Sequence, residues 1–214
     1  MVTTDFWSAV LPVTPRADWM TRVSELAAEA SQRRSKADYN TGSIAWMEAY
    51  QLCALATHIG AKVVIEVGTF VGTSTYALAL AECVEDVYTC DASNDCCPST
   101  DRVHTHPFTA SQDMLIGLLK KRVSADLCFF DGHLSNEDVN ALRVLTHDRT
   151  VFAFHDYNYG PKIRRRKDGT TYQETLPRKG IGNVDLLKPH LPHHVLIEPL
   201  PDNVLALMVP ESML

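Results

Sequence analysis

The sequence predicts a doubly wound α/β domain, in which helices cover both faces of a largely parallel sheet. From residue 62 onward, short apolar runs alternate with stretches of helical periodicity, as expected for parallel strands joined by helices. The 214 residues are 45% hydrophobic and 21% charged, which is enough to bury one core without metals or disulfides. We therefore expect a single domain spanning residues 1–214.

Two helices are predicted before the first strand. Residues 16–35 carry apolar side chains at helical spacing between charged positions, and residues 43–59 form a second, more buried pattern. Thr41 or Ser43 is available as the N-cap of the second helix, and Gly60 is a usual C-terminal stop. Residues 1–59 are expected to form an N-terminal helical cover.

The strands follow from short apolar runs bounded by polar or helical stretches. Five are predicted before the C-terminal part, at residues 62–67, 86–90, 103–108, 125–130 and 150–155, with helices near 73–84, 111–122 and 135–147. Two more runs, 194–200 and 204–210, are joined by a short Pro-Asp-Asn turn. One strand of this terminal pair must run antiparallel to the rest.

The segment 157–180 interrupts this pattern, because it has no periodicity. It contains seven Lys or Arg residues against two acids, whereas the whole chain has a net charge of -6. So long an irregular segment in a compact domain is more often functional than not, and we expect a basic active-site loop. The run 162–167 either meets an anionic or polyhydroxyl acceptor or is simply solvated.

The charge and composition exclude several classes of protein. A pI near 5.8 argues against nucleic acid or an anionic membrane as a partner. The start of the chain lacks a positively charged n-region, and no run reaches 18 apolar residues, so a cytoplasmic protein is expected. The six cysteines form no CxxC pair and are expected to be reduced, with zinc or disulfide chemistry as alternatives. Whether the chain forms a homo-oligomer stays open.

The stretch VVIEVGTFVGTSTYALA, residues 63–79, places Gly68 and Gly72 between a buried strand and a helix. Without Cβ atoms, these residues allow a ligand to approach the backbone closely; a tight structural turn is the alternative. Asp91 ends the next strand, where a carboxylate can accept from both hydroxyls of a ribose. The glycine spacing differs from the G-x-G-x-x-G pattern of dinucleotide folds.

This E-x-G-x-x-x-G-x-S turn, together with Asp91, resembles the class I S-adenosylmethionine (SAM)-dependent methyltransferases. Residues 39–79 are similar to the opening of the subgroup related to catechol and macrocin O-methyltransferases, and the resemblance extends to about Val209. It implies a seven-stranded mixed sheet of order 3-2-1-4-5-7-6, counted along the chain, with the last strand antiparallel. It also implies SAM as the cofactor.

The resemblance further implies a set of cofactor contacts from the segment before the second helix, the glycine turn and the later strand ends. The matching positions are Thr41, Gly42, Glu66, Gly68, Gly72, Ser74, Asp91, Ser111, Gln112 and Asp131.

Polar residues also follow the fourth and fifth strands. Asp131 ends one, and His155 and Asp156 end the other, so all three are expected at the same edge of the sheet as the glycine turn. In metal-dependent members of the subgroup, such residues hold Mg²⁺, and His133 is the first candidate for the general base, with His155 in reserve. The D-G-H and His-Asp sequences depart from the subgroup pattern, so a metal-independent histidine mechanism stays open.

The predicted function is SAM-dependent O-methylation of a small hydroxylated acceptor, such as a sugar or another natural product. One alternative is a SAM-binding protein without catalysis. The other is an NAD-dependent Rossmann oxidoreductase, which the absence of G-x-G-x-x-G and of Tyr-x-x-x-Lys disfavours.

Overall fold

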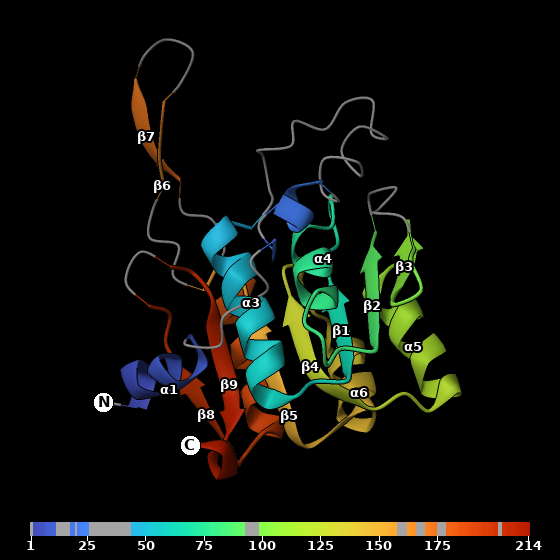
Figure 1. Cartoon of the computed structure of the whole chain (residues 1–214). Coiled ribbons are helices and arrows are strands. Elements are labelled where there is room, and N and C mark those ends of the chain that lie inside the picture. The colour runs from blue at the N-terminus through green and yellow to red at the C-terminus, as the bar shows by residue number, and fades with distance from the viewer. Residues whose placement is uncertain are drawn as a thin grey trace.

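Seven strands form one mixed sheet in the computed structural model (Figure 1). The structure describes residues 2–11, 18–19, 21–25, 44–92, 99–157, 162–165, 170–174, 179–200 and 203–214. The strands of the sheet are β1 Val63–Val67, β2 Asp86–Asp91, β3 Val103–Pro107, β4 Ala125–Phe130, β5 Thr146–Phe154, β8 His194–Ile197 and β9 Ala206–Pro210. Their order is β3-β2-β1-β4-β5-β9-β8, and β9 runs antiparallel to both of its neighbours. The predicted fold class and strand order are confirmed.

Helices cover both faces of the sheet. On one face lie α1 (Val2–Val10), α3 (Trp46–Ile59) and α4 (Thr73–Ala79), and on the other α5 (Ser111–Lys121), α6 (Asn136–Leu145) and α7 (Lys179–Leu187). Along β4, Leu127 and Phe129 pack into the first core, whereas Cys128 and Phe130 pack into the second. Because both faces are buried, the central strands are mostly apolar, as expected for parallel strands, with Glu66 of β1 as a buried exception.

The strand register aligns the carboxyl ends of four neighbouring strands. Val67 of β1 pairs with Cys90 of β2 and with Phe130 of β4. Phe130 pairs in turn with Phe154 of β5. The residues that directly follow these four therefore form one row across the edge of the sheet, which we call the end row: Gly68, Asp91, Asp131 and His155.

Some elements were not predicted. Helices α1 and α7 are absent from the sequence-based assignment, as is a hairpin formed by β6 (Lys162–Arg165) and β7 (Thr171–Glu174). The two hairpin strands form a separate two-stranded sheet and project beyond the carboxyl ends of the main sheet (Figure 1). Short 3-10 helices, Lys188–His190 and Glu211–Met213, follow α7 and β9.

Helix α3 begins later than the predicted residue 43. Its N-cap is Ala45, in extended conformation, and the Glu48 carboxylate accepts a hydrogen bond from the Ala45 N–H at 2.8 Å. The predicted N-caps Thr41 and Ser43 lie outside the described residues, as does Gly42. The predicted end is confirmed, since Gly60 terminates the helix with φ 65°.

The structure describes part of the predicted N-terminal helix and four of the six cysteines. Trp19 and Val23 are buried in the core beside α3, and the rest of the predicted 16–35 helix beyond residues 18–19 and 21–25 is not described. Cys53, Cys83, Cys90 and Cys128 are free thiols. Within the described part of the chain, no helix combines the length and apolarity needed to cross a membrane.

Candidate active site

Gly68, the residue after β1, lies close to the backbone that follows β4. A Cβ on Gly68 would lie 2.9 Å from the Gly132 nitrogen and 3.0 Å from the Asp131 carbonyl carbon. Its φ of 102° also falls where other residues are rare. A Cβ on Gly132 would conversely lie 2.9 Å from Val67 Cγ1. The neighbouring strand end is therefore a physical reason for glycine at position 68, and the ligand contact suggested by the sequence stays a prediction.

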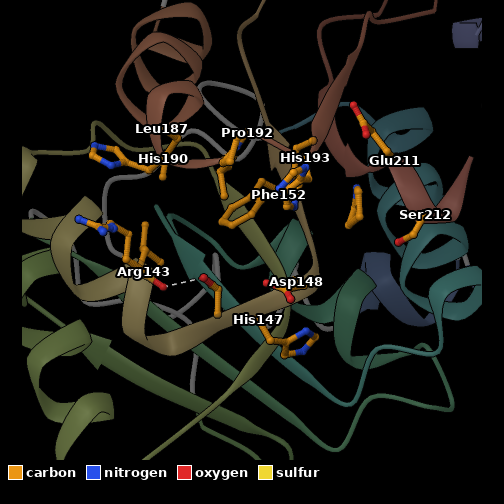
Figure 2. Close-up of a pocket in the computed structure, with 15 residues that line it drawn as sticks. Arg143, His147, Asp148, Phe152, Leu187, His190, Pro192, His193, Glu211 and Ser212 are labelled. Atoms are coloured by element: carbon orange, nitrogen blue, oxygen red, sulfur yellow. Dashed lines mark hydrogen bonds between the residues drawn. The ribbon is translucent and has the colours of Figure 1, made fainter.

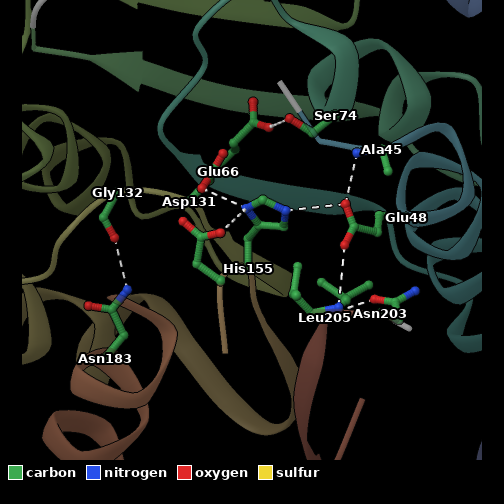
Figure 3. A network of polar contacts seen from close by, with 12 residues as sticks. Ala45, Glu48, Glu66, Ser74, Asp131, Gly132, His155, Asn183, Asn203 and Leu205 are labelled. Atoms are coloured by element: carbon green, nitrogen blue, oxygen red, sulfur yellow. Dashed lines mark hydrogen bonds and ion pairs between the residues drawn. The ribbon is translucent and has the colours of Figure 1, made fainter. Parts of the chain in front are cut away.

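Glu66 is completely buried beneath the glycine turn. Its carboxylate accepts hydrogen bonds from the hydroxyls of Ser74, Thr75 (2.5 Å) and Thr89 (2.6 Å), as Figure 3 shows in part. Burial raises the pKa of Glu66 to about 7, although the three hydroxyl donors oppose this shift. Glu66 thus connects β1 to the first turn of α4, through Ser74 and Thr75, and to β2, through Thr89. Contact of Glu66 and Ser74 with the cofactor stays a prediction.

Asp91 connects the end of β2 to the glycine turn. Its Oδ2 accepts a hydrogen bond from the Phe70 N–H at 2.9 Å, and Phe70 has a left-handed φ of 48°. Ser111 and Gln112 lie at the start of α5, where the Ser111 hydroxyl donates to Asp138 Oδ2 at 2.9 Å and Gln112 is exposed. Asp91 is thus placed in the end row, whereas Ser111 also links α5 to α6.

His155 is buried between two carboxylates that come from opposite directions. Its Nδ1 lies 2.9 Å from Asp131 Oδ1, and its Nε2 lies 3.2 Å from Glu48 Oε2 (Figure 3). Burial alone would lower the pKa of His155, but the hydrogen bonds to Asp131 and Glu48 outweigh it and raise the pKa to about 10. Burial would likewise raise the pKa of Glu48, but the hydrogen bond from His155 lowers it. Both partners are therefore charged.

Asp156 completes a group that can hold a cation. One ligand atom from each of Asp131, His155 and Asp156 lies within 4.8 Å of the others, and His155 Nδ1 is 3.6 Å from Asp156 Oδ1. Asp156 has a φ of 58°, a conformation that Asp adopts more readily than most residues. The structure thus brings all three predicted metal ligands together.

His133 lies on the loop that follows β4 and is exposed. The loop is fixed by Asn183 of α7, whose Nδ2 donates to the Gly132 carbonyl at 2.8 Å and whose Oδ1 accepts from the Leu134 N–H at 3.0 Å. These two bonds flank His133 on both sides (Figure 3 shows the first). Gly180 brings α7 close enough for this, because a Cβ there would lie 2.4 Å from the His155 carbonyl oxygen.

Solved structures of methyltransferases, among them O-methyltransferases, match almost the whole chain. An O-methyltransferase from Bacillus cereus in complex with SAH is 18% identical, with a TM-score of 0.60 over 97% of this chain and 96% of that one. TomG from Streptomyces achromogenes, involved in tomaymycin synthesis and solved with SAM, is 16% identical, with a TM-score of 0.61 over 98% and 95%. SAH-bound PaMTH1 from Podospora anserina is 14% identical, with a TM-score of 0.58 over 98% and 95%. The chain has the fold of an O-methyltransferase. No protein-family model and no curated protein matches its sequence.

Two residues near the end row of this O-methyltransferase fold were missed by sequence reasoning. Glu48 lies 107 positions before His155, and Asn183 lies 51 positions after Gly132. Glu48 lies inside the predicted helix 43–59, where nothing in the sequence distinguishes it from other polar helix residues. For Asn183 the sequence contains no signal, because α7 was not predicted.

The O-methyltransferase fold also contains a cavity of about 470 Å³ far from the end row (Figure 2). Leu142, Phe152 and Leu187 line its apolar floor, while Arg143 and several histidines, including His190, lie around it. The cavity is bordered by Thr146, the first residue of β5, and by Pro210, the last of β9. It therefore lies at the opposite edge of the sheet and is separate from the candidate active site.

The charged state of His155 predicts that the metal-free protein loses stability as the pH rises. The pKa of His155 is about 10 in the folded state and about 6.5 when unfolded, so its contribution is complete below 6.5 and is lost as the pH rises through 10. Between pH 7 and 8.5, the free energy of unfolding should fall by about 2 kcal/mol.

Urea unfolding in EDTA across this range measures the effect. The range ends at 8.5 because the buried thiols of Cys53 and Cys128, whose pKa values burial raises, lower the stability above it. A His104→Gln variant, which removes a half-exposed pair with Asp86, should show the same slope as the wild type. A flat profile from pH 7 to 8.5 would contradict a charged His155.

Proposed function

We propose that this protein is a SAM-dependent O-methyltransferase that acts on a small hydroxylated acceptor. The end row supports this proposal most directly. In it, the strand register aligns a glycine turn with two carboxylates and one imidazole. In open α/β sheets, ligands bind outside the carboxyl ends of the strands. The solved neighbours with SAM or SAH bound share this fold over nearly their full length, which supports the same cofactor here.

For the cofactor, the proposal assigns the ribose to Asp91 and the methionine part to the glycine turn. Asp91 is the last residue of β2 and lies beside the glycine turn, where its Oδ2 accepts a hydrogen bond from the Phe70 N–H. Glu66 keeps the turn in place through three hydroxyl groups. Contacts from Thr41, Gly42, Ser111 and Gln112 remain proposals that the resemblance implies.

For a divalent cation, the donor set of Asp131, His155 and Asp156 fits. Ligand atoms at right angles around one ion with bonds of about 2.1 Å are about 3 Å apart, and Asp131 Oδ1 and His155 Nδ1 are separated by 2.9 Å. The imidazole of His155 is also surrounded by three carboxylates, those of Glu48, Asp131 and Asp156. Since one ligand is a nitrogen, we propose that Mn²⁺ or Zn²⁺ binds more tightly than the Mg²⁺ expected from the sequence.

The residues of the chain then have separate tasks in methyl transfer. The reaction is an in-line displacement, so the protein mainly aligns the acceptor oxygen with the methyl group and removes a proton. A bound cation would lower the pKa of the acceptor hydroxyl. His133, exposed on the loop that Asn183 fixes, is proposed to take the proton. The buried His155, with both nitrogens engaged, is better suited to hold the site together than to act as the base.

Binding and turnover measured separately test this function. Isothermal titration of the protein with SAM should show one site, and incubation with SAM and a panel of catechols, sugars and phenolic natural products should produce SAH. Binding without turnover on any acceptor would favour a SAM-binding protein without catalysis. Binding of NAD in place of SAM would favour the oxidoreductase alternative.

Chelation should distinguish the cation-assisted mechanism from the one that uses histidine alone. We expect EDTA to suppress methyl transfer and Mn²⁺ to restore it at a lower concentration than Mg²⁺, because of the nitrogen ligand. Asp131→Asn and Asp156→Asn should lose both rate and metal dependence, and Asn is chosen because it tolerates the left-handed φ of Asp156.

The matched control for these variants is Asp113→Asn, which changes an exposed acid on α5 and should keep the metal dependence. Full activity in EDTA with SAM still bound would eliminate the cation and leave the histidine mechanism.

The basic segment 157–180 is proposed to cover the acceptor. Its described part includes the β6–β7 hairpin, which projects from the same edge of the sheet as the end row (Figure 1). Gly180, at its end, contacts the backbone of His155 and Tyr157. The segment is thus connected directly to the strand end that carries the proposed cation ligands.

A further inference from the structure

One buried carboxylate, Glu48, joins three distant segments of the chain beside the end row. Its Oε2 accepts from the Ala45 N–H and from His155 Nε2, while its Oε1 accepts from the Val204 N–H at 3.4 Å. The side chain is only 5% exposed. Figure 3 shows this carboxylate between the start of α3 and the imidazole.

A helix cap alone does not require this arrangement. A Ser or Thr N-cap satisfies the first-turn N–H groups without burying a charge, and burial of a carboxylate costs several kcal/mol unless it is paired. In Glu48, the compensating partner is the imidazole of His155. The ion pair with His155 therefore explains why the Glu48 carboxylate is buried at this position.

A carboxylate accepts hydrogen bonds and donates none, so without a cation the charged ring donates Nε2–H to Glu48 and Nδ1–H to Asp131. A cation bound between Asp131 and Asp156 would replace the proton on Nδ1. Glu48 would still accept from Nε2–H on the far side of the ring. A partner on the far nitrogen also fixes the orientation of the ring.

We propose that Glu48 is a positioning residue, which holds the His155 ring so that Nδ1 points at the cation site between Asp131 and Asp156. The inference rests on the proposed function, because it gives Nδ1 the role of a ligand. It adds a residue from the N-terminal helical cover to a site otherwise built from strand ends.

Glu48→Leu is the informative variant. Leu keeps much of the volume of the side chain but removes the oxygen that accepts from His155 Nε2. The ring would then lose the partner that directs Nδ1 toward the cation site. The matched control is Gln51→Ala, one turn further along α3, which removes a hydrogen bond from Asn203 and leaves His155 untouched.

Isothermal titration of the metal-free proteins with Zn²⁺ and with Mn²⁺ gives the first readout. We expect Glu48→Leu to bind either ion about 10- to 100-fold more weakly than the wild type, and Gln51→Ala to bind as the wild type does. Affinity in Glu48→Leu within twofold of the wild type, or an equal loss in Gln51→Ala, would overturn the proposal.

NMR of ¹⁵N-histidine-labelled protein gives a readout that needs neither metal nor activity. In the wild type, His155 should show a slowly exchanging proton on Nε2, and in Glu48→Leu the exchange of this proton should become fast. A wild-type spectrum without a protonated Nε2 overturns the proposal even if the variant does not fold. If the wild type binds no ion but shows this proton, the proposed cation fails and the hydrogen bond that orients the ring stands.

Discussion

Gly68→Ala should lose about 2–6 kcal/mol of folding stability and, with it, the binding of SAM. The added methyl group would lie 2.9 Å from the Gly132 nitrogen, a backbone atom that cannot move without displacing the end of β4. The φ of 102° adds conformational strain for any residue with a Cβ. Because Asp131 precedes Gly132, the same displacement would disturb the end row.

The matched control is Gly117→Ala in α5, where a Cβ would have no neighbour within 4 Å. Ala is the better helix former, so this variant should be up to about 1 kcal/mol more stable than the wild type. Urea unfolding of the three proteins measures both effects. A Gly68→Ala protein as stable as the wild type would show that the two strand ends do not constrain each other.

His133→Ala should lower kcat by about 10²–10⁴-fold while the affinity for SAM stays close to that of the wild type. An acceptor hydroxyl is a poor nucleophile at neutral pH, and an exposed imidazole on a fixed loop can take its proton. The Asn183 side chain fixes the loop through Gly132 and Leu134, so removing the imidazole should not alter the backbone.

Steady-state kinetics and titration with SAM together measure this effect. His190→Ala, an exposed histidine at the opposite edge of the sheet, should behave as the wild type. The acidic limb of the pH–rate profile should disappear in His133→Ala only. A kcat within twofold of the wild type would remove His133 as the base and return His155 or an acceptor-bound water to consideration.

The fold class could be predicted from the sequence because its causes are local. Apolar runs such as residues 125–130 alternate with helical periodicity, and this order is compatible with few arrangements other than a parallel sheet covered on both faces. The positions of Asp91, Asp131 and His155 at neighbouring strand ends follow from the same reasoning, because carboxyl ends of parallel strands share one edge. The structure confirms the fold and the strand order, whereas the chemical roles of these residues stay predictions.

The sequence therefore predicts which residues reach the end row, whereas the contacts that hold them there form only in the folded chain. The Glu48–His155 contact spans 107 positions, and the Asn183–Gly132 contact spans 51, so no local period records either. The requirement for glycine at position 68 likewise depends on Gly132, a residue of another strand end. Side-chain periodicity reports burial of each segment, but a contact between two segments exists only after the chain has packed.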